Sequence, residues 1–277
     1  MSKGSIIITG ASDGIGKALA YEMAKQSDGA FLLRIEDIDQ SRARPKWEQQ
    51  IYEDLKWLGL SWDQDVCRQS DNIATYKQAL EILWRKGLLY PCTCNRRDIA
   101  AAASAPQEGA PMLGPDGVIY PGMCRAKTNR TGPLPQAVTL RLDTAKLVDT
   151  LTGTLRYTET GLNMSDVLIQ SKDLPHTIGD VVIARQDMGT SYHLSVVIDD
   201  AAQNISHVVR GADLADATKI HVLLQNALNL PTPIYHHHKL IRDNAGKRLA
   251  KRDDARAIAK YREDGLHPDD LRQMLGV

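Results

Sequence analysis

The first 35 residues constrain the fold of this chain more than any other segment. Residues 5–9 are a short, mostly apolar run that predicts a buried strand, and a glycine-rich turn follows it. Ile15, Leu19 and Met23 then recur at helical spacing, and residues 31–35 predict a second buried strand. A strand, a helix and a strand in this order predict an α/β fold with a Rossmann-like, doubly wound parallel sheet.

The charge balance limits how the protein can hold a nucleic acid. Its 277 residues include 34 Lys plus Arg and 34 Asp plus Glu, so the formal net charge is zero. This excludes binding by bulk electrostatic attraction alone, and any RNA contact is expected to be a local patch. The apolar runs fall far short of the roughly 20 residues of a membrane-spanning helix, and no signal peptide is apparent. We expect a cytoplasmic protein without a membrane partner.

The glycine-rich turn is a first candidate ligand site. Its glycines lie between the predicted strand and helix, at Gly10, Gly14 and Gly16. In this context backbone N–H groups can approach a phosphate, and Glu36 or Asp37 has about the spacing of a ribose-binding carboxylate. Residues 4–26 resemble the cofactor loop of short-chain dehydrogenases, which implies an NAD- or NADP-binding oxidoreductase. A tight turn without a ligand is the other interpretation.

A dehydrogenase of this type also needs a Tyr-x-x-x-Lys pair, in which the Lys lowers the pKa of the Tyr for proton transfer. Two pairs have the right spacing. Tyr21 and Lys25 lie on the predicted first helix, and Tyr235 and Lys239 lie in a segment expected to be extended. Neither context fits, so chance explains both spacings better.

Three of the four cysteines lie in a segment that lacks helical or strand periodicity. Cys92, Cys94 and Cys124 fall where Ala, Gly and Pro accumulate, and such a long segment needs something to hold it. Their clustering indicates a metal site, whereas Cys92 and Cys94 alone would also suit two small buried hydrophobes. Cys67 stands apart as an ordinary thiol. We expect a first part of the Rossmann-like domain over residues 1–89, a metal-binding insertion over 90–135 and the remainder of that domain over 136–277.

Several motifs from residue 31 onward resemble the catalytic core of class I glutamyl-tRNA synthetases. In chain order they are Phe31-Leu-Leu-Arg-Ile-Glu-Asp-Ile-Asp39, Asp54-Leu-Lys-Trp-Leu-Gly-Leu60, Tyr90-Pro-Cys-Thr-Cys94, Tyr192-His-Leu-Ser-Val-Val-Ile-Asp-Asp200, Val209-Arg-Gly-Ala-Asp213 and Gly246-Lys-Arg-Leu-Ala-Lys-Arg252. The likeness is greatest to short members of the family that lack an anticodon-binding domain. It implies a ligase that activates L-glutamate with ATP and Mg²⁺, then transfers it to queuosine at the wobble position of tRNA(Asp).

The resemblance also implies roles for individual residues. Glu36 and Tyr192 correspond to positions that line the glutamate site, and Arg210 to the residue that meets a substrate carboxylate. Arg suits this role because its planar fork can donate two parallel hydrogen bonds. The residues alone would favour a surface ion pair between Arg210 and Asp213. Lys251 takes the place of the last Lys in the Lys-Met-Ser-Lys-Ser-type signature, which stabilises charge on the ATP phosphates.

The metal set is also completed by the resemblance, which implies three thiolates and one tyrosine as zinc ligands. They are Cys92, Cys94, Tyr120 and Cys124. Four ligands would form a closed structural site that holds the segment together. The tyrosine as fourth ligand rests on the resemblance alone.

Over the first 30 residues the resemblance fails. The family opens with an Arg-Phe-Ala-Pro-Ser-Pro-Thr-Gly strand and turn and a His-Ile-Gly-His-type signature, and this chain has no His before Phe31. Because those histidines bind the ATP phosphates, we expect adenylate formation to be impaired. Two other interpretations stay open: the dinucleotide-dependent oxidoreductase, and a pseudoenzyme that binds tRNA without catalysis.

Overall fold

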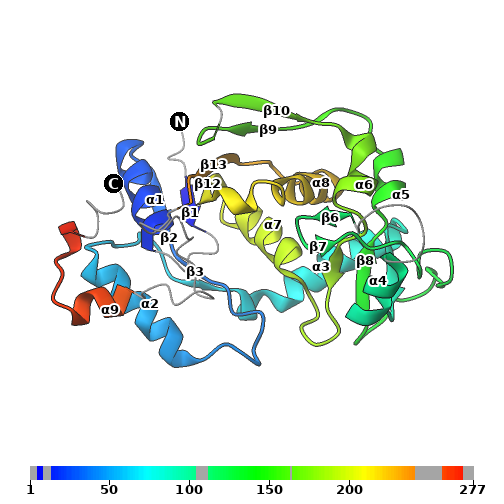
Figure 1. Ribbon diagram of the computed structural model, residues 1–277, viewed down its shortest axis with the longest axis horizontal. Coiled ribbons are helices and arrows are strands. Elements are labelled where there is room, and N and C mark those ends of the chain that lie inside the picture. The colour runs from blue at the N-terminus through cyan, green and yellow to red at the C-terminus, as the bar shows by residue number, and fades with distance from the viewer. Residues whose placement is uncertain (1–4, 9–13, 104–111, 163, 241–257, 271–277) are drawn as a thin grey trace.

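The computed structural model describes residues 5–8, 14–103, 112–162, 164–240 and 258–270, and its main sheet has six strands in the order β10-β9-β13-β12-β1-β2 (Figure 1). Their bounds are β1 (Ser5–Ile8), β2 (Ala30–Leu32), β9 (Leu155–Glu159), β10 (Ser165–Ile169), β12 (Ile205–Gly211) and β13 (Ile234–His238). Neighbouring strands run parallel, except that β10 pairs antiparallel with β9. The expected parallel sheet is therefore confirmed, with an antiparallel edge that the sequence did not reveal.

The sheet winds in two directions from its centre. The chain passes from β1 through α1 (Gly14–Gln26) to β2, and from β12 through α8 (Thr218–Leu228) to β13 on the other side. Crossovers between parallel strands are right-handed, so these opposite directions put α1 and α8 on opposite faces. The winding reverses between β1 and β12. Ligands of such sheets bind beyond the carboxyl ends of the strands at this point.

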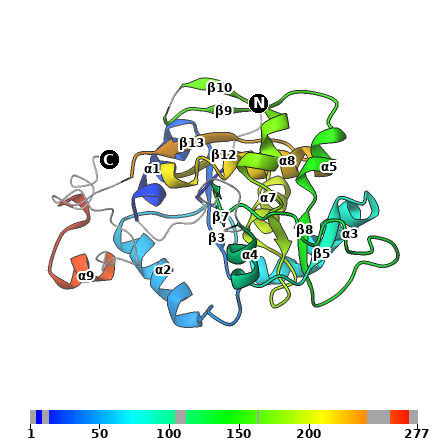
Figure 2. The same ribbon diagram turned by 45° about the vertical axis from the view of Figure 1, so that its right-hand side comes forward.

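Smaller sheets and the remaining helices surround this centre (Figures 1 and 2). An antiparallel sheet has the order β11-β8-β5, and β3 pairs with β4 and β6 with β7. These strands are β3 (Arg34–Ile35), β4 (Cys67–Arg68), β5 (Leu89–Cys92), β6 (Leu113–Gly114), β7 (Gly117–Val118), β8 (Thr139–Leu142) and β11 (Val182–Ala184). The helices are α2 (Pro45–Trp57), α3 (Ile73–Arg85), α4 (Arg96–Ala103), α5 (Thr144–Asp149), α6 (Leu174–Thr177), α7 (Tyr192–Ala202), α9 (Ile258–Glu263) and the 3₁₀ helices η1 (Gln69–Asn72), η2 (Ser171–Asp173) and η3 (Ala212–Leu214). Among the described helices, none combines the length and apolar character needed to cross a membrane.

The main core forms where α3, α7 and α8 pack together beside the sheets. On α3, the buried residues Tyr76, Leu80 and Leu83 recur at intervals of four and three, which aligns them on one face. Each such side chain contributes about 1.5–3 kcal/mol when it is fully buried. The helix ends before Gly87, whose φ of 67° lies in the left-handed region that favours glycine.

The first helix packs tightly on the main sheet. Ala20 and Ala24 are one turn apart and fully buried, and they contact Phe31 of β2 and Val209 of β12. The Tyr21 ring meets the Phe31 ring edge-on, with 5.5 Å between the ring centres. Two small residues on one face let the helix approach the strands closely. The helix of the dehydrogenase-like segment therefore packs on the same sheet as helices of the rest of the chain.

Candidate active site and metal centre

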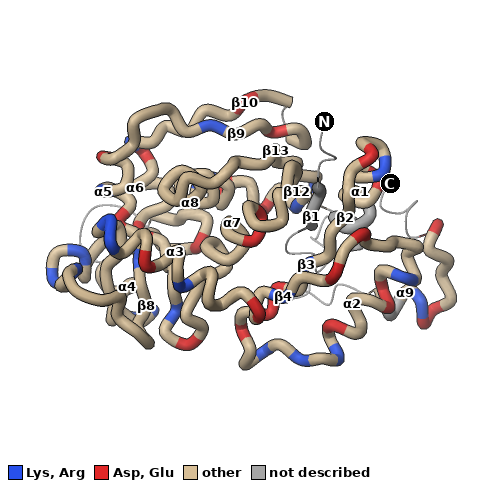
Figure 3. Tube along the Cα trace, turned by 180° about the vertical axis from the view of Figure 1, so that it is seen from behind, with Lys and Arg blue, Asp and Glu red and all other residues tan. Residues whose placement is uncertain are grey.

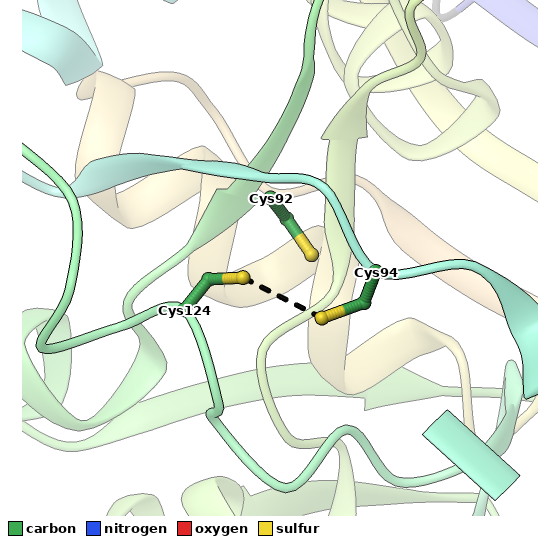
Figure 4. A group of neighbouring side chains, drawn as sticks. All are labelled: Cys92, Cys94 and Cys124. Atoms are coloured by element: carbon green, nitrogen blue, oxygen red, sulfur yellow. Dashed lines mark hydrogen bonds between the residues drawn. The ribbon is translucent and has the colours of Figure 1, made fainter. Parts of the chain in front are cut away.

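Three cysteine side chains from two separate parts of the chain point toward one another (Figure 4). Cys92 ends β5, Cys94 follows two residues later, and Cys124 comes after the β6–β7 hairpin. All three sulfurs lie within 4.8 Å of one another, and those of Cys94 and Cys124 are 3.4 Å apart. Cys67 is elsewhere, where its sulfur accepts a hydrogen bond from the Asn72 amide at 3.4 Å. The cysteines therefore form a group that can hold a metal ion, with Cys67 excluded as expected.

Tyr120 completes this arrangement. Its hydroxyl oxygen is 3.5 Å from the Cys92 sulfur and 3.3 Å from the Cys94 sulfur, and it accepts the Cys124 backbone N–H at 3.0 Å. We call Cys92, Cys94, Tyr120 and Cys124 the cysteine cluster. A tetrahedral ion with bonds of 2.0–2.3 Å would hold its ligand atoms about 3.5–3.8 Å apart. The observed spacing is close to that requirement.

A cation lies against the cysteine cluster. Arg141 of β8 donates from Nε to the Cys92 sulfur at 3.2 Å, and its guanidinium carbon is 3.9 Å from the centre of the Tyr120 ring. Burial on its own would raise the pKa of Cys124, but hydrogen bonding, first of all with Tyr120, lowers that pKa to about 6. The surroundings therefore favour a thiolate at Cys124, and thiolate is the form that binds metals.

A buried ion cluster joins β3 to the C-terminal half of α7. Arg34, 5% exposed, donates from Nη1 to Asp200 at 2.8 Å, and its Nε lies 4.0 Å from an Asp199 oxygen. The Glu36 carboxylate is 3.7 Å from Nη2 of Arg34. Burial would lower the pKa of Arg34, but these three carboxylates raise it instead. We call Arg34, Asp199 and Asp200 the Arg34 cluster. Glu36 is thus located beside a buried cation.

A second buried arginine lies near the carboxyl end of β12. Arg210 is 2% exposed, and it donates from Nε to His237 at 3.1 Å, from Nη1 to His221 at 3.1 Å and from Nη2 to Thr218 at 2.5 Å. His237 bonds in turn through Nδ1 to the Glu159 carboxylate. We call these five residues the Arg210 cluster. Its burial rules out the surface ion pair that the sequence left open for Arg210.

The histidines of the Arg210 cluster are held neutral by their surroundings. Burial lowers the pKa of His221 well below its usual 6.5, and the positive charge of Arg210 adds to this effect. Burial also lowers the pKa of His237, although the Glu159 carboxylate opposes that shift. Neutral imidazoles can accept the hydrogen bonds that Arg210 donates. The cluster therefore concentrates its positive charge on Arg210.

Tyr192 lies at the start of α7, beside these histidines. Its ring centre is 6.0 Å from that of His221 and 5.7 Å from that of His193. Ser191 precedes it as the N-cap residue and accepts a hydrogen bond from the Leu194 N–H at 3.4 Å, which fixes the start of the helix. Tyr192 and Arg210 therefore both lie beside the ring of His221.

The structure describes some of the other expected site residues but not all of them. Gly14 and Gly16 lie in the first turn of α1. Gly10 and Lys251 lie outside the described residues. The segment that contains Tyr235 was expected to be extended, and this is confirmed. It forms β13, in which His237 faces inward and is fully buried.

Several polar residues of the site were not found from the sequence. Arg34, Glu159, His193 and His221 form no recognisable motif of their own, although Arg34 and His193 lie inside the motifs that resemble the family. The available signal was weak: a charged residue in an apolar strand, as with Arg34 between Leu33 and Ile35, suggests a buried ion pair. Their partners come from distant parts of the chain, which no local pattern reveals.

Comparison with known proteins identifies relatives of this chain. The sequence profile of the class I tRNA synthetases (E and Q), catalytic domain, matches residues 15–277. A glutamyl-Q tRNA(Asp) synthetase of Rhodobacter capsulatus is 57% identical over 263 residues, which cover 94% of this chain and 92% of the relative. One of Symbiobacterium thermophilum is 38% identical over 263 residues, which cover 91% of this chain and 76% of the relative.

Solved structures share the fold. The crystal structure of a glutamate tRNA ligase from Elizabethkingia meningosepticum, in complex with its amino acid, has a TM-score of 0.74 at 24% identity. The comparison covers all of this chain, which spans 61% of that longer one. A Mycobacterium tuberculosis methionyl-tRNA synthetase, bound by methionyl-adenylate, has a TM-score of 0.52 at 12% identity.

The profile match begins within α1, sixteen residues before the first motif recognised in the sequence at residue 31. The helix of the dehydrogenase-like segment thus falls inside the matched region. All the relatives described above are tRNA synthetases, and none supports the oxidoreductase interpretation. The chain belongs to the class I tRNA synthetase (E and Q) family of ligases, among its glutamyl-Q tRNA(Asp) synthetases.

Proposed function

We propose that this protein activates L-glutamate with ATP and transfers it to queuosine in tRNA(Asp). The observation that carries the proposal is the 57% identity to the Rhodobacter capsulatus relative, which extends over 94% of this chain. The buried arginine at the reversal point of the sheet supports it physically, because that is where ligands of doubly wound sheets bind.

Arg210 would hold a carboxylate of the amino acid. The guanidinium has five N–H donors, and three of them bond to His237, His221 and Thr218 within the described residues. One N–H on each of Nη1 and Nη2 is therefore available for an end-on, two-point contact with a carboxylate. Glu36 and Tyr192 would line the same site, with the Glu36 carboxylate suited to the substrate ammonium group. Lys251 would stabilise charge on the ATP phosphates.

We propose zinc as the metal of the cysteine cluster. Three thiolates, one phenolate and a Zn²⁺ ion sum to a charge of −2, and the adjacent Arg141 offsets part of it. With four protein ligands the site would be closed, so the ion would stabilise the segment rather than take part in chemistry. Apart from the metal, the cluster also gains rigidity from β5, because Cys92 lies in a strand that pairs with β8.

A basic surface at the start of α2 would contact the RNA. Lys and Arg recur along the chain here (Figure 3), and Arg42, Arg44 and Lys46 line a hollow of about 620 Å³ together with Trp47. The Trp47 side chain is 52% exposed, and the Lys46 ammonium is 4.5 Å from the centre of its ring. Cations suit phosphates, and an exposed aromatic ring suits an unstacked base. This is a local patch of the kind that a neutral protein needs in order to bind RNA.

Glutamate-dependent exchange of pyrophosphate into ATP tests the activation step. We would compare the chain with a chimera in which residues 1–30 are replaced by the matching segment of the Rhodobacter capsulatus relative. Restoring donors to the ATP phosphates should raise the exchange rate on the order of 10²-fold. Labelled glutamate should then transfer to tRNA(Asp) that carries queuosine and not to tRNA(Asp) that lacks it. A folded, zinc-loaded chimera with exchange at background would refute the proposal.

The basic surface is tested by its salt dependence. The double variant Arg44→Glu with Lys46→Glu should weaken tRNA binding and lower the slope of log affinity against log salt by about 1 per lost phosphate contact. The control, Lys77→Glu with Lys172→Glu, makes the same charge change at exposed positions on α3 and η2. Equal slopes for the two double variants would exclude this surface as the RNA contact.

A further inference from the structure

The β6–β7 hairpin of the cysteine-bearing segment packs against α6 and α7. Its turn, Gly114-Pro115-Asp116-Gly117, has the Pro-Asp-Gly order that favours a tight turn, and Gly117 has a positive φ of 96°. The backbone passes so close to α6 that a Cβ on Gly114 would lie 2.8 Å from the Thr177 carbonyl oxygen. The hairpin is therefore seated closely against its neighbour, and Asp116 occupies its tip.

Asp116 is the end of a chain of hydrogen bonds that begins at Arg210. Its carboxylate oxygens lie 2.9 and 3.0 Å from Nε2 of His193. Nδ1 of His193 is 3.0 Å from Nε2 of His221, and Nδ1 of His221 is 3.1 Å from Nη1 of Arg210. Both histidines are buried, with exposed fractions of 7% and 2%. Four side chains from four elements, the β6–β7 turn, α7, α8 and β12, thus form one continuous path.

The direction of every proton in this path follows from Arg210. An arginine only donates, so Nδ1 of His221 must accept and its proton must be on Nε2. That N–H donates to Nδ1 of His193, which must be unprotonated, so His193 carries its proton on Nε2 and donates to Asp116. Both rings are then neutral. Because His193 donates from Nε2, the last group of the path must be a hydrogen-bond acceptor, as the Asp116 carboxylate is. The buried, low-pKa His221 agrees with this assignment.

We propose that Asp116 is a positioning residue for Arg210: it fixes the orientation of His193 and, through His221, the plane of the guanidinium that meets the amino acid. This rests on the proposed function, and it gives the cysteine-bearing segment a role in the amino-acid site in addition to its own folding. A hairpin displaced from the His193 ring would leave the buried imidazole without its acceptor. Arg210 would then be held by fewer fixed partners.

Two substitutions of Asp116 distinguish the loss of its hydrogen-bond acceptor from the loss of its negative charge. Asp116→Ala removes the acceptor, whereas Asp116→Asn keeps an amide oxygen that can accept the His193 N–H. With Asp116→Ala we expect the KM for glutamate to rise about tenfold while kcat changes little, because an interaction equal in ground and transition states is weakened. Asp116→Asn should stay within about threefold of the unaltered chain. Asp98→Ala, on α4 of the same segment, is the matched control and should change neither constant.

Nitrogen NMR of the histidine side chains tests the path without any substrate. In the unaltered chain, His193 and His221 should both show the neutral form protonated at Nε2, and Asp116→Ala should disturb the His193 signal while Asp116→Asn preserves it. Observation of His193 protonated at Nδ1 at neutral pH would overturn the proposal. So would an unchanged KM in Asp116→Ala, equal defects in both variants, or a loss of zinc that accounts for the defect. Background exchange by the chimera with the replaced residues 1–30 would count against the proposed function, and the NMR result would still decide whether the hydrogen-bond path exists.

Discussion

The cysteine cluster and the Arg210 cluster differ in the groups that balance their charges. The cysteine cluster gathers groups that become anionic when they lose their protons, and Arg141 is the cation that lies against it. The Arg210 cluster contains its own cation, neutral histidines as acceptors and a carboxylate at its outer end. The first is thus a group that can hold a metal ion, whereas the second carries its cation and that cation's partners within the chain. Substituting a metal ligand should affect the cysteine cluster, and lowering the pH should affect the histidines of the Arg210 cluster.

The largest expected effect is the loss of a metal ligand. Cys124→Ala should reduce bound zinc from about one ion per chain to nearly none and lower the unfolding free energy by several kcal/mol, since metal binding contributes to folding. Elemental analysis and denaturant unfolding would measure the two effects. Cys67→Ala is the control and should retain its zinc, because Cys67 lies outside the cluster. Full zinc occupancy in Cys124→Ala would show that the cluster does not hold the ion.

Breaking the Arg34 cluster should come next in magnitude. Arg34→Met leaves the buried carboxylates of Asp199 and Asp200 without their cation, which typically costs about 3–5 kcal/mol. Urea unfolding would measure the loss. Arg185→Ala removes an exposed pair with Asp187, at 2.8 Å, and should cost less than about 1 kcal/mol. Similar losses in both variants would mean that burial does not set the strength of the Arg34 cluster.

The smallest effect per residue is the pH dependence that comes from histidines whose pKa is lowered by burial. Burial lowers the pKa of His221, His236 and His237 in the folded protein. Below the unfolded value of about 6.5, the unfolded chain binds more protons, so stability should fall as the pH drops, by up to about 1.4 kcal/mol per histidine and pH unit. Urea unfolding of zinc-saturated protein at pH 7.5 and 5.5 would measure this slope.

The histidine contribution has its own variant and control. His221→Asn keeps an acceptor near the position of Nδ1 and removes the titrating ring, so the loss of stability between the two pH values should shrink. His176→Gln, which removes an exposed ring on α6, should leave the loss unchanged. A slope that is the same in all three proteins would assign the pH dependence to other groups.

The two clusters also differ in how far they could be predicted. Cys92, Cys94 and Cys124 were recognised from their spacing and residue type, and the structure brings them together. Tyr120 needed the family resemblance, because a tyrosine is not a typical zinc ligand. In the Arg210 cluster, by contrast, the resemblance pointed to Arg210 itself, and none of the groups that hold it was identified.

The supporting partners escaped prediction because their contacts are remote in sequence. Arg34 and Asp200 are separated by 166 positions, and Asp116 and His193 by 77. Neither pair has a periodicity or a fixed spacing that a local pattern could reveal. The antiparallel β9–β10 edge also went unpredicted, since short strands of mixed polarity such as Ser165–Ile169 lack a clear alternation.

The sequence by itself determined the opening β-α-β unit, the parallel sheet and the position of the thiols, because strand and helix periodicity and residue chemistry are local properties. Only the tertiary structure decided that α1 packs on the sheet of a synthetase through Ala20 and Ala24, and that Arg210 is buried among neutral histidines. The physical reason is desolvation. The charge state and orientation of a polar group depend on which distant groups replace its water, and only the folded chain specifies them.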